Sequence, residues 1–386
     1  MLVRSVHRRS IDFLSAAISA VALPCHGTPA RRFQSSTTSA AAAAQLQANL
    51  QPAVRDASGR FPVTASGPRF RDLFHWMLTR GPDDAPLPSD LSELETTLPV
   101  LTPDFSAPIP ADHARLTWLG HASVLLEVPT SPAGDKFVVL TDPVFTDRCS
   151  PSQWFGPARY RPPPVTPDTL PPVDVVLVSH NHYDHLEEVT LAQLHAAQPH
   201  IRYITPLGNG YLLQEAGIPA ANITEQNWWD QTPAGSSFQV GCVPANHWSK
   251  RGFFDRNKSL WGGFVVQGLG GSFYFAGDTA TGSIFEAIRH RYGDQSVSAI
   301  PIGAYAPRRL FKDQHCNVEE AIQIHKDVGS RASVGIHWGT WVLTGEYYLE
   351  PKEELARLMA AETSSDDTFE TVDHGASKVV PWQLTK

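Results

Sequence analysis

The sequence has little that could build a disulfide framework or a cysteine-based zinc site. Its four cysteines are Cys25, Cys149, Cys242 and Cys316, and none of them belongs to a CxxC pair. Long apolar runs are also missing: the run at residues 11–24, about 14 residues, is too short to cross a bilayer comfortably. The sequence therefore argues against a small disulfide-rich protein and against a multi-span membrane protein.

Positive charge is in deficit as well. Basic residues number 31 against 39 acidic ones, which gives a formal net charge of −8. Because a phosphate backbone calls for a basic surface, this balance argues against nucleic acid as the main partner. The 386 residues, 42% of them apolar, suffice for one large α/β domain with additions or for two small domains. The 16 histidines, several in short clusters, are a first indication of metal.

The first 39 residues have a composition of their own. Residues 1–39 are rich in arginine, serine and alanine, with Asp12 as the single acid, which is typical of a mitochondrial presequence. Residues 31–36 resemble a cleavage region. A secretory signal or a plain tail would also fit this composition. We predict a presequence at residues 1–39, a flexible linker at 40–66 and the main folded domain at 67–386.

An amphipathic helix is predicted where this domain begins, between residues 68 and 80. Its apolar face has helical spacing and consists of Phe70, Leu73, Phe74, Met77 and Leu78. Such a helix could lie in a membrane interface, or it could pack on the body of the protein. Both interpretations stay open from the sequence.

From residue 115 onward, strand-like runs alternate with helical patterns and no internal repeat is present. Strands are predicted at residues 116–128, 137–141, 173–179, 238–243, 263–266, 273–276, 298–302 and 334–336. Helices are predicted at residues 191–197, 207–216, 284–291 and 318–328. This order favours an α/β fold of the αββα type, in which two mixed β-sheets are covered by helices.

Four potential metal ligands follow the apolar run 173–179 within six residues. They are His180, His182, Asp184 and His185. Imidazoles and a carboxylate are the ligands that zinc takes when a water molecule must also bind. Because four ligands on one compact loop cannot all reach a single tetrahedral ion, we expect two ions to share them.

The pattern His-x-His-x-Asp-His after a buried strand resembles the signature of the metallo-β-lactamase superfamily. The resemblance implies the metallo-β-lactamase αββα fold, a first metal on His180 and His182, and a second metal on Asp184 and His185. It also implies three ligands from later strand ends, of which the second would bridge the metals: His247 in PANHW, Asp278 in FAGDT and His337 in IHWGT.

Other motifs, between about residue 68 and residue 386, are similar to those of N-acyl-phosphatidylethanolamine-hydrolysing phospholipase D. They include WLGHAS at 118–123, LTDPVF at 140–145, SPSQ at 150–153, NKSLWG at 257–262, IPIGAY at 300–305 and YLEP at 348–351. The resemblance implies two Zn²⁺ per chain. It further implies that a metal-bound hydroxide attacks phosphorus and releases N-acylethanolamine and phosphatidic acid. The enzyme would be a homodimer on a membrane surface. The composition of residues 1–39 predicts that this membrane is mitochondrial, with another intracellular membrane as the alternative.

The resemblance also suggests residues that act beside the metals. Tyr183 and His315 match substrate-contacting residues of that family, although Tyr183 could be a packing residue and His315 an exposed loop histidine. Asp142 is expected to orient a ligand histidine. Asp184 is expected to be a ligand, and whether it also accepts a proton from the attacking water stays open. His121 would either orient a ligand or make a structural hydrogen bond.

Two other functions remain possible on the sequence. One is a different two-metal hydrolase of the same fold, such as a lactonase or a phosphodiesterase for soluble substrates; the helix at 68–80 favours a lipid substrate instead. The other is a non-catalytic lipid-binding protein, which the presence of all seven ligands argues against. Departures from the family pattern at residues 279–282 and 308–311 leave the acyl chain and the head group open.

Overall fold

The computed structural model describes residues 36–62, 70–79, 86–362 and 366–384. The chain divides into two units, residues 1–42 and residues 43–386. Most of the predicted presequence, including its cleavage region up to residue 35, lies outside the described residues. Within the described ranges we find no helix whose length and apolar character would let it traverse a bilayer.

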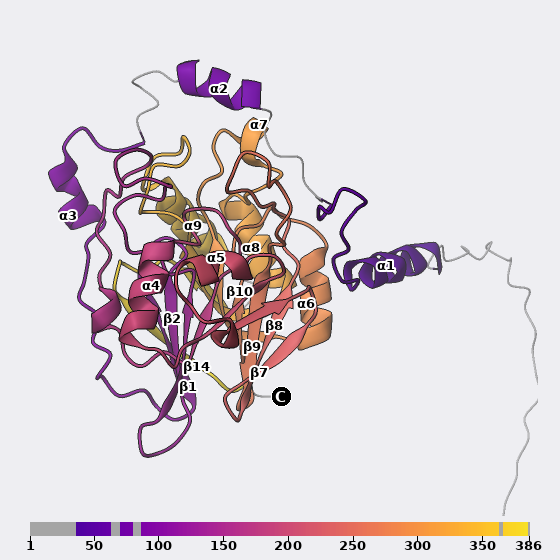
Figure 1. Cartoon of the computed structure of the whole chain (residues 1–386). Helices are drawn as coiled ribbons and strands as arrows, with labels where there is room; N and C mark the ends of the chain where they lie inside the picture. The colour runs from indigo at the N-terminus through magenta and orange to yellow at the C-terminus, as the bar shows by residue number, and fades with distance from the viewer. Residues whose placement is uncertain (1–35, 63–69, 80–85, 363–365, 385–386) are drawn as a thin grey trace, which may run out of the picture. The chain divides into compact units, whose positions relative to one another are not determined.

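The second unit contains two seven-stranded sheets (Figure 1). The first has the order β14-β1-β2-β3-β4-β5-β6. Its strands are β14 (Ser377–Pro381), β1 (His113–Trp118), β2 (Val124–Pro129), β3 (Lys136–Thr141), β4 (Val175–Leu177), β5 (Arg202–Pro206) and β6 (Ile223–Gln226). The pairs from β14 to β3 are antiparallel and the pairs from β3 to β6 are parallel, so the sheet is mixed.

The second sheet repeats this division into an antiparallel half and a parallel half. Its order is β13-β12-β11-β10-β9-β8-β7. Its strands are β13 (Thr368–Glu370), β12 (Ser330–Ile336), β11 (Gln295–Pro301), β10 (Gly271–Phe275), β9 (Gly263–Gly268), β8 (Phe238–Val243) and β7 (Gln231–Ala234). The pairs from β7 to β10 are antiparallel and those from β10 to β13 are parallel.

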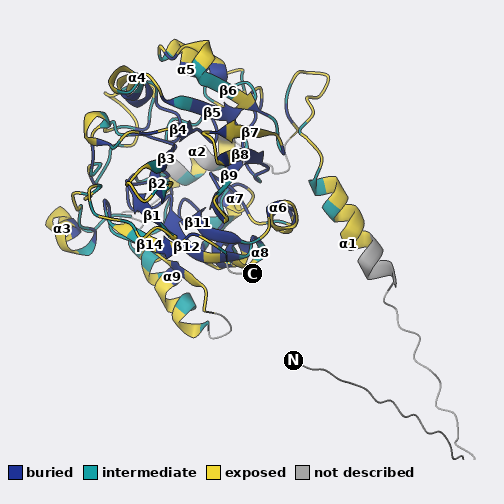
Figure 2. Ribbon diagram, turned by 90° about the horizontal axis from the view of Figure 1, so that it is seen from below, coloured by how far each residue is buried: buried dark blue, intermediate teal, exposed yellow. Residues whose placement is uncertain are grey.

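Helices cover the outer faces of both sheets (Figure 2). The helices of the described residues are α1 (Ser36–Asn49), α2 (Phe70–Thr79), α3 (Leu94–Thr97), α4 (Glu188–Ala197), α5 (Gly210–Glu215), α6 (Ile284–Tyr292), α7 (Arg308–Phe311), α8 (Val318–Asp327) and α9 (Glu350–Ala361). Three short 3₁₀ helices lie at Leu91–Glu93, Pro167–Thr169 and Ala220–Asn222. Helices α4 and α5 lie over the first sheet, and α6, α8 and α9 over the second.

Alternation along the strands of the first sheet divides the core in two. Val176 of β4 packs in the cluster that contains Leu191 and Leu194 of α4. Val175 and Leu177, its neighbours, pack in the large cluster shared with the second sheet. Side chains of a strand point to opposite faces in turn, so a strand that is apolar at every position must be covered on both sides. The predicted sandwich of two mixed sheets is confirmed.

Between residues 40 and 62 the structure differs from the flexible linker that we expected at residues 40–66; residues 63–66 lie outside the described residues. Helix α1 runs through the alanine-rich segment to Asn49, because alanine has the highest helix propensity of all residues. Beyond it the chain is held to the body: Ala53 exchanges hydrogen bonds with the Asn227 side chain, and Phe61 is buried. The segment from Ala53 to Phe61, called the strap below, is part of the folded unit.

The predicted strand at residues 116–128 is also corrected, because it is two strands. β1 and β2 form an antiparallel hairpin around residues 119–123. Gly120 has φ +100° and His121 has φ +51°, so the chain reverses there instead of continuing. The reversal brings His121 towards the end of the sheet where β3 and β4 finish. The helix predicted at residues 68–80 is confirmed as α2.

Candidate metal centre

The predicted metal ligands all follow the carboxyl end of a strand. The loop with His180, His182, Asp184 and His185 begins after β4, whereas three later ligands follow β8, β10 and β12 and are His247, Asp278 and His337. The structure brings these side chains together in two groups whose candidate ligand atoms lie within 4.8 Å of one another. The first group is His180, His182, His247 and Asp278, and the second is His121, Asp184, His185 and His337.

Three imidazoles of the first group converge on one point. His182 Nδ1 lies 2.8 Å from His180 Nε2 and 3.2 Å from His247 Nε2. Asp278 Oδ2 lies 3.9 Å from His180 Nε2 and 3.6 Å from His247 Nε2. Three ring nitrogens and one carboxylate that face a common point are a donor set for a tetrahedral ion.

The second group contacts the same carboxylate, through both of its oxygens. Asp278 Oδ1 lies 3.0 Å from His337 Nε2, and Asp278 Oδ2 lies 3.2 Å from His185 Nε2. Asp184 Oδ2 lies 3.5 Å from His185 Nε2 and 3.4 Å from His337 Nε2. Asp278 therefore faces both groups, which is the placement that a bridging carboxylate would need.

Hydrogen bonds on the far side of the rings determine which nitrogen faces the centre. His247 donates from Nδ1 to the carbonyl oxygen of Gln314 at 3.0 Å, and His185 donates from Nδ1 to Asp142 Oδ2 at 2.6 Å. A ring that donates from Nδ1 has its lone pair on Nε2. Both Nε2 atoms are therefore acceptors that point into the centre, as a metal ligand requires.

Asp142 is hydrogen-bonded to His185 and, through Ser179, is connected to a second candidate ligand. It is fully buried, and it accepts hydrogen bonds from the Ser179 amide at 2.7 Å and from the Ser179 hydroxyl at 2.6 Å. The same hydroxyl lies 2.9 Å from His180 Nδ1. Asp142 thus orients His185 directly and His180 through Ser179, one ring in each group.

His121 approaches the centre from the β1–β2 turn. Its Nε2 lies 3.0 Å from Asp184 Oδ2, and its carbonyl oxygen accepts the His337 amide hydrogen at 2.9 Å. Of the two roles open for His121, the geometry favours orientation of a ligand, because the ring contacts a ligand carboxylate. His121, Asp142 and His337 all have positive φ, at 51°, 34° and 64°. Such backbone conformations are costly for residues other than glycine and concentrate at functional sites.

Gly277 is required for the position of Asp278. Its φ is +59°, and a Cβ there would come within 2.9 Å of the Ser179 side chain and 3.0 Å of the Gly262 carbonyl oxygen. A larger residue would push the turn after β10 away from β4. The glycine therefore allows the bridging carboxylate to approach the His180 loop.

The charges in the centre are strongly coupled. Burial lowers the pKa of His182 to about 3 and that of His180 well below its ordinary value, so both rings are neutral. Burial alone would also lower the pKa of His185, but Asp278 and Asp184 raise it well above its ordinary value. Neutral imidazoles and ionised carboxylates are the forms that bind metal, so a cation at His185 would have to displace the proton that the two carboxylates hold on this ring.

The donor set fits a pair of divalent cations. Asp278 is buried, and its two oxygens face ring nitrogens of the candidate ligands, with His337 Nε2 nearest to Oδ1 and His185 Nε2 nearest to Oδ2. A buried carboxylate is costly without a balancing charge, and a cation would compensate it. Imidazole nitrogens and carboxylate oxygens with no thiolate suit zinc or another first-row divalent ion.

The two predicted substrate residues have different surroundings. His315 is not the exposed loop histidine of the alternative interpretation: its side chain is 12% exposed, and its Nδ1 lies 3.9 Å from Asp278 Oδ2. Tyr183 is half-buried, and the guanidinium of Arg251 lies 3.9 Å from the centre of its ring. Tyr183 therefore packs against Arg251 at the edge of the centre.

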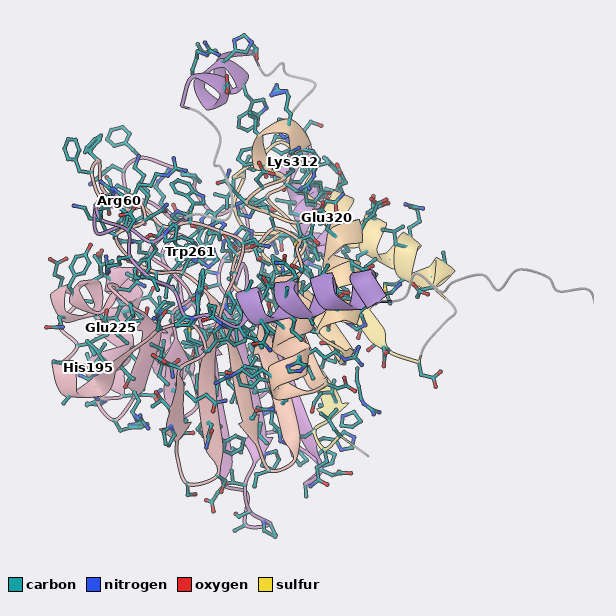
Figure 3. All side chains as sticks on the ribbon, turned by 90° about the vertical axis from the view of Figure 1, so that its right-hand side faces the viewer. Arg60, His195, Glu225, Trp261, Lys312 and Glu320 are labelled. Atoms are coloured by element: carbon teal, nitrogen blue, oxygen red, sulfur yellow. The ribbon has the colours of Figure 1, made fainter. Side chains whose placement is uncertain are left out.

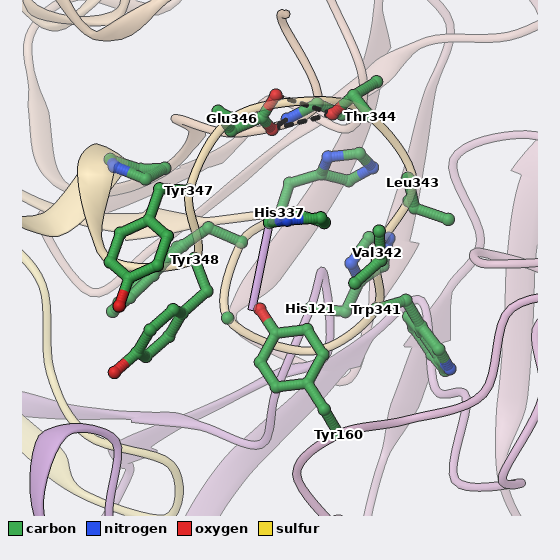
Figure 4. A pocket seen from close by; sticks show the side chains of 15 residues that line it. His121, Tyr160, His337, Trp341, Val342, Leu343, Thr344, Glu346, Tyr347 and Tyr348 are labelled. Carbon is green, nitrogen blue, oxygen red and sulfur yellow. Dashed lines mark hydrogen bonds between the residues drawn. The ribbon is translucent and has the colours of Figure 1, made fainter. Parts of the chain in front are cut away.

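A small cavity adjoins the second group (Figure 4). Its lining includes His121, His337, Tyr160 and Trp341. Its volume is about 30 Å³, which is enough for water but not for an acyl chain. Glu346 at its edge is already satisfied by the amides of residues 304 and 306 and by the Thr344 hydroxyl. The cavity is a candidate place for water beside the metal ligands.

Several residues that contact the candidate ligands are not predicted from the sequence. Ser179 and Trp248 each stand next to a predicted ligand, which was an available signal; Trp248 packs edge-on against His182 at 4.8 Å. Arg251 and Gln314 carried no comparable signal. Gln314 contributes a backbone carbonyl, which every residue possesses, and only the fold shows that it faces His247.

Comparisons with known proteins agree with this geometry. Residues 138–338 match the family described as "Beta-lactamase superfamily domain". The chain is 42% identical over 301 residues to N-acyl-phosphatidylethanolamine-hydrolyzing phospholipase D 1 of Caenorhabditis elegans, which covers 75% of this chain and 82% of the relative. It is 36% identical over 226 residues to the mitochondrial N-acyl-phosphatidylethanolamine-hydrolyzing phospholipase D of Saccharomyces cerevisiae, covering 57% of this chain and 47% of the relative.

Among solved structures, the metallo hydrolase Igni18 of Ignicoccus hospitalis is similar in fold. The superposition has a TM-score of 0.51 and 18% sequence identity, and it covers 69% of this chain and 98% of that one. At this identity the likeness supports the fold alone. Fold, donor groups and sequence similarity agree, and the chain belongs to the N-acyl-phosphatidylethanolamine-hydrolysing phospholipase D family of metal-dependent hydrolases in the β-lactamase superfamily.

Proposed function

We propose that this protein is a two-zinc phosphodiesterase that hydrolyses N-acyl-phosphatidylethanolamine to N-acylethanolamine and phosphatidic acid. The observation that carries the proposal is the position of Asp278 between two groups of imidazole and carboxylate donors. Two ions in those groups would lower the pKa of a water molecule towards about 7 and polarise the phosphoryl oxygens.

The protein's own contribution is to hold the donors in place before the reaction. Asp142 and the Gln314 carbonyl direct the lone pairs of His185 and His247 inward. His121 holds the carboxylate of Asp184 on its outer side. Because these partners are buried, the donors need little reorganisation when charge develops on the substrate.

His315 and Tyr183 are proposed to contact the head group. His315 is stacked on His337 at 5.4 Å and edge-on to His247 at 5.2 Å, so it lies against both groups. Its Nδ1 is buried and has no hydrogen-bond partner. That nitrogen is available to a phosphoryl or leaving-group oxygen. Asp184 is proposed as a ligand, and a role in proton transfer is compatible with its 16% exposed side chain.

We extend the proposal to location and assembly. The enzyme would be a peripheral protein of a mitochondrial membrane surface, supported by the arginine-rich residues 1–39 and by the mitochondrial name of the yeast relative. It would act as a homodimer and would not bind nucleic acid, in line with the net charge of −8. Helix α2 contributes Trp76, which packs edge-on against Phe311 at 5.9 Å. This contact favours a helix that rests on the enzyme over one that lies free in lipid.

The test combines metal analysis with product identification. Purified protein is assayed for bound metal and incubated with vesicles that contain N-acyl-phosphatidylethanolamine, and products are identified by mass spectrometry. The proposal predicts two zinc ions per chain, N-acylethanolamine and phosphatidic acid. Release of choline or a lysophospholipid would refute the assignment. Activity on lactones or soluble phosphodiesters alone would favour a different two-metal hydrolase of this fold.

A further inference from the structure

The loop after β8 ends in a tip whose two aromatic side chains project into solvent. Phe253 is 92% exposed and Phe254 is 85% exposed. Single exposed apolar residues are common, but two neighbouring phenylalanines on one tip leave a large apolar area in water. The tip, residues 250–258, contains no other apolar side chain until the chain turns back to Leu260.

Hydrogen bonds within the loop fix the backbone conformation in which the two rings are exposed. Asp255 accepts hydrogen bonds from the amides of Arg251 and Gly252 at 3.0 and 2.9 Å. Asn257 donates its amide hydrogen to the Ser249 carbonyl oxygen at 2.8 Å and closes the base of the loop. A loop with this many internal bonds has few alternative conformations in which the phenylalanines could turn inward.

The strap forms hydrogen bonds with the backbone of the tip. Arg60 donates to the carbonyl oxygens of Arg256 and of Phe254, and the Phe61 amide donates to the Asn257 carbonyl oxygen at 2.8 Å. Figure 3 places Arg60 above Trp261, away from the lower ends of the strands. The strap therefore holds the backbone beside the exposed rings.

The charge around the rings is opposite to that of the whole protein. Residues 250–258 carry four basic residues, Lys250, Arg251, Arg256 and Lys258, against the single acid Asp255, in a chain whose net charge is −8. Lys250, Arg256 and Lys258 are exposed. Aromatic side chains flanked by cations are suited to the interface of an anionic lipid bilayer, where rings enter the head-group region and cations contact phosphates.

The same loop is connected to the metal centre. Its first residue beyond the ligand His247 is Trp248, which packs against His182, and Arg251 lies over the ring of Tyr183. A second exposed aromatic pair, Trp154 and Phe155, lies in the segment that follows β3 and Asp142. Both segments leave strand ends that carry site residues, so both aromatic pairs belong to the end of the molecule that holds the centre.

We propose that the basic, phenylalanine-tipped loop at residues 250–258 is a membrane anchor that binds an anionic lipid bilayer and seats the metal centre against it. This inference rests on the proposed lipid substrate, which it deepens by naming the surface that meets the membrane. When the loop enters the bilayer interface, a lipid phosphate could reach the centre while the rest of the lipid stays in the bilayer.

The experiment measures co-sedimentation of full-length protein with vesicles of phosphatidylcholine and phosphatidylglycerol that contain no N-acyl-phosphatidylethanolamine. Binding is thus measured without hydrolysis, and a failure of the proposed reaction would not affect the result. The variant is F253S/F254S, and the matched control is Leu269→Asn. Leu269 is an exposed apolar residue (40%) at the other end of β10 from Asp278, and its φ of +51° suits asparagine.

We expect F253S/F254S to lose vesicle affinity about tenfold or more, with the Leu269→Asn control at wild-type affinity. Because both rings are exposed, melting temperature and metal content should match the control. A second variant, K250Q/K258Q, should lose the preference for phosphatidylglycerol over pure phosphatidylcholine. Wild-type affinity of F253S/F254S would overturn the proposal, as would failure of the wild type to bind vesicles. A change in oligomeric state caused by F253S/F254S would assign the tip to a protein interface instead.

Discussion

Asp278 is the residue on which the pairing of the two donor groups depends. Its Oδ2 atom lies 3.2 Å from His185 Nε2 and 3.6 Å from His247 Nε2, and its Oδ1 atom lies 3.0 Å from His337 Nε2. Replacement by asparagine removes the negative charge between the groups while retaining the shape. We expect Asp278→Asn to lose both metals and essentially all turnover, measured by metal analysis and product formation.

The control for this variant is Asp174→Asn. Asp174 precedes β4, at the opposite end of that strand from the His180 loop, and its carboxylate accepts the Val138 amide hydrogen at 2.7 Å. It should retain the metal content of the wild type. If Asp278→Asn kept two zinc ions and the full rate, the bridging assignment would be wrong.

Asp142 belongs to neither of the two donor groups around Asp278, but it orients two of their members. Its replacement therefore measures how much this orientation contributes to metal binding. It accepts from His185 Nδ1 and from the Ser179 hydroxyl. An asparagine amide placed there would donate a hydrogen to one of these partners, which favours the wrong tautomer of His185. We expect Asp142→Asn to weaken metal binding about 10- to 100-fold. Competition titration with a chelator would measure it, and loss of one metal before the other would identify the affected group.

The sequence was informative about these residues where the chemistry is local. Four ligands stand within six residues, and such a cluster is visible without a fold. The contacts that orient them join distant residues: Gln314 lies 67 positions from His247, and His121 lies 63 positions from Asp184. No pattern along the chain encodes such contacts, because they depend on the order in which the strands are arranged.

Contacts between distant segments cannot be read from the sequence, and this also explains which strands could be predicted. Strands β3, β8 and β10 are apolar runs that could be located by composition. In strand β14 three exposed residues alternate with the partly buried Lys378 and the buried Val380, and the segment becomes a strand because β1 offers it an antiparallel edge. The alanine-rich part of the expected linker is helix α1, since low complexity indicates disorder only where helix propensity is weak.

The β1–β2 hairpin contains a buried ion pair that should matter for stability. Arg115 is 3% exposed and Glu127 is fully buried, and they are joined by two hydrogen bonds of 2.6 and 2.8 Å. Glu127 also binds Lys136 at 2.9 Å. Glu127→Gln would leave the buried Arg115 guanidinium without its counter-charge. We expect a loss of about 3–5 kcal/mol in the free energy of unfolding, measured by denaturant titration.

An exposed pair serves as the comparison. Arg289 and Asp294 are about half exposed and lie 2.8 Å apart. Water screens such a pair, so Asp294→Asn should cost well under about 1 kcal/mol. An equal effect of the two variants would mean that burial does not set the strength of the Arg115–Glu127 interaction. Metal content should be unchanged in both, because neither pair touches the centre.

For the whole molecule, the two sheets meet at the metal centre. The first sheet supplies His180, His182, Asp184 and His185 from the loop after β4. The second sheet supplies His247, Asp278 and His337. A metal pair would therefore connect the sheets directly, in addition to the apolar core between them. The metal-free protein must hold buried carboxylates and imidazoles together without that compensation.

Metal removal should accordingly destabilise the entire fold. A ligand that binds only the folded state, at a free concentration about 1,000-fold above its dissociation constant, adds about 4 kcal/mol. For a domain of this size that corresponds to a fall in melting temperature of roughly 6 °C when a chelator strips the protein. Calorimetry of treated and untreated protein would measure it, and added zinc should reverse it. The Asp278→Asn protein provides the decisive comparison, because its melting temperature should respond neither to chelator nor to zinc. A large change in the melting temperature of that variant on addition of chelator or zinc would mean that the stabilising ion binds elsewhere. A metal pair between the two sheets would then not be the source of the stabilisation.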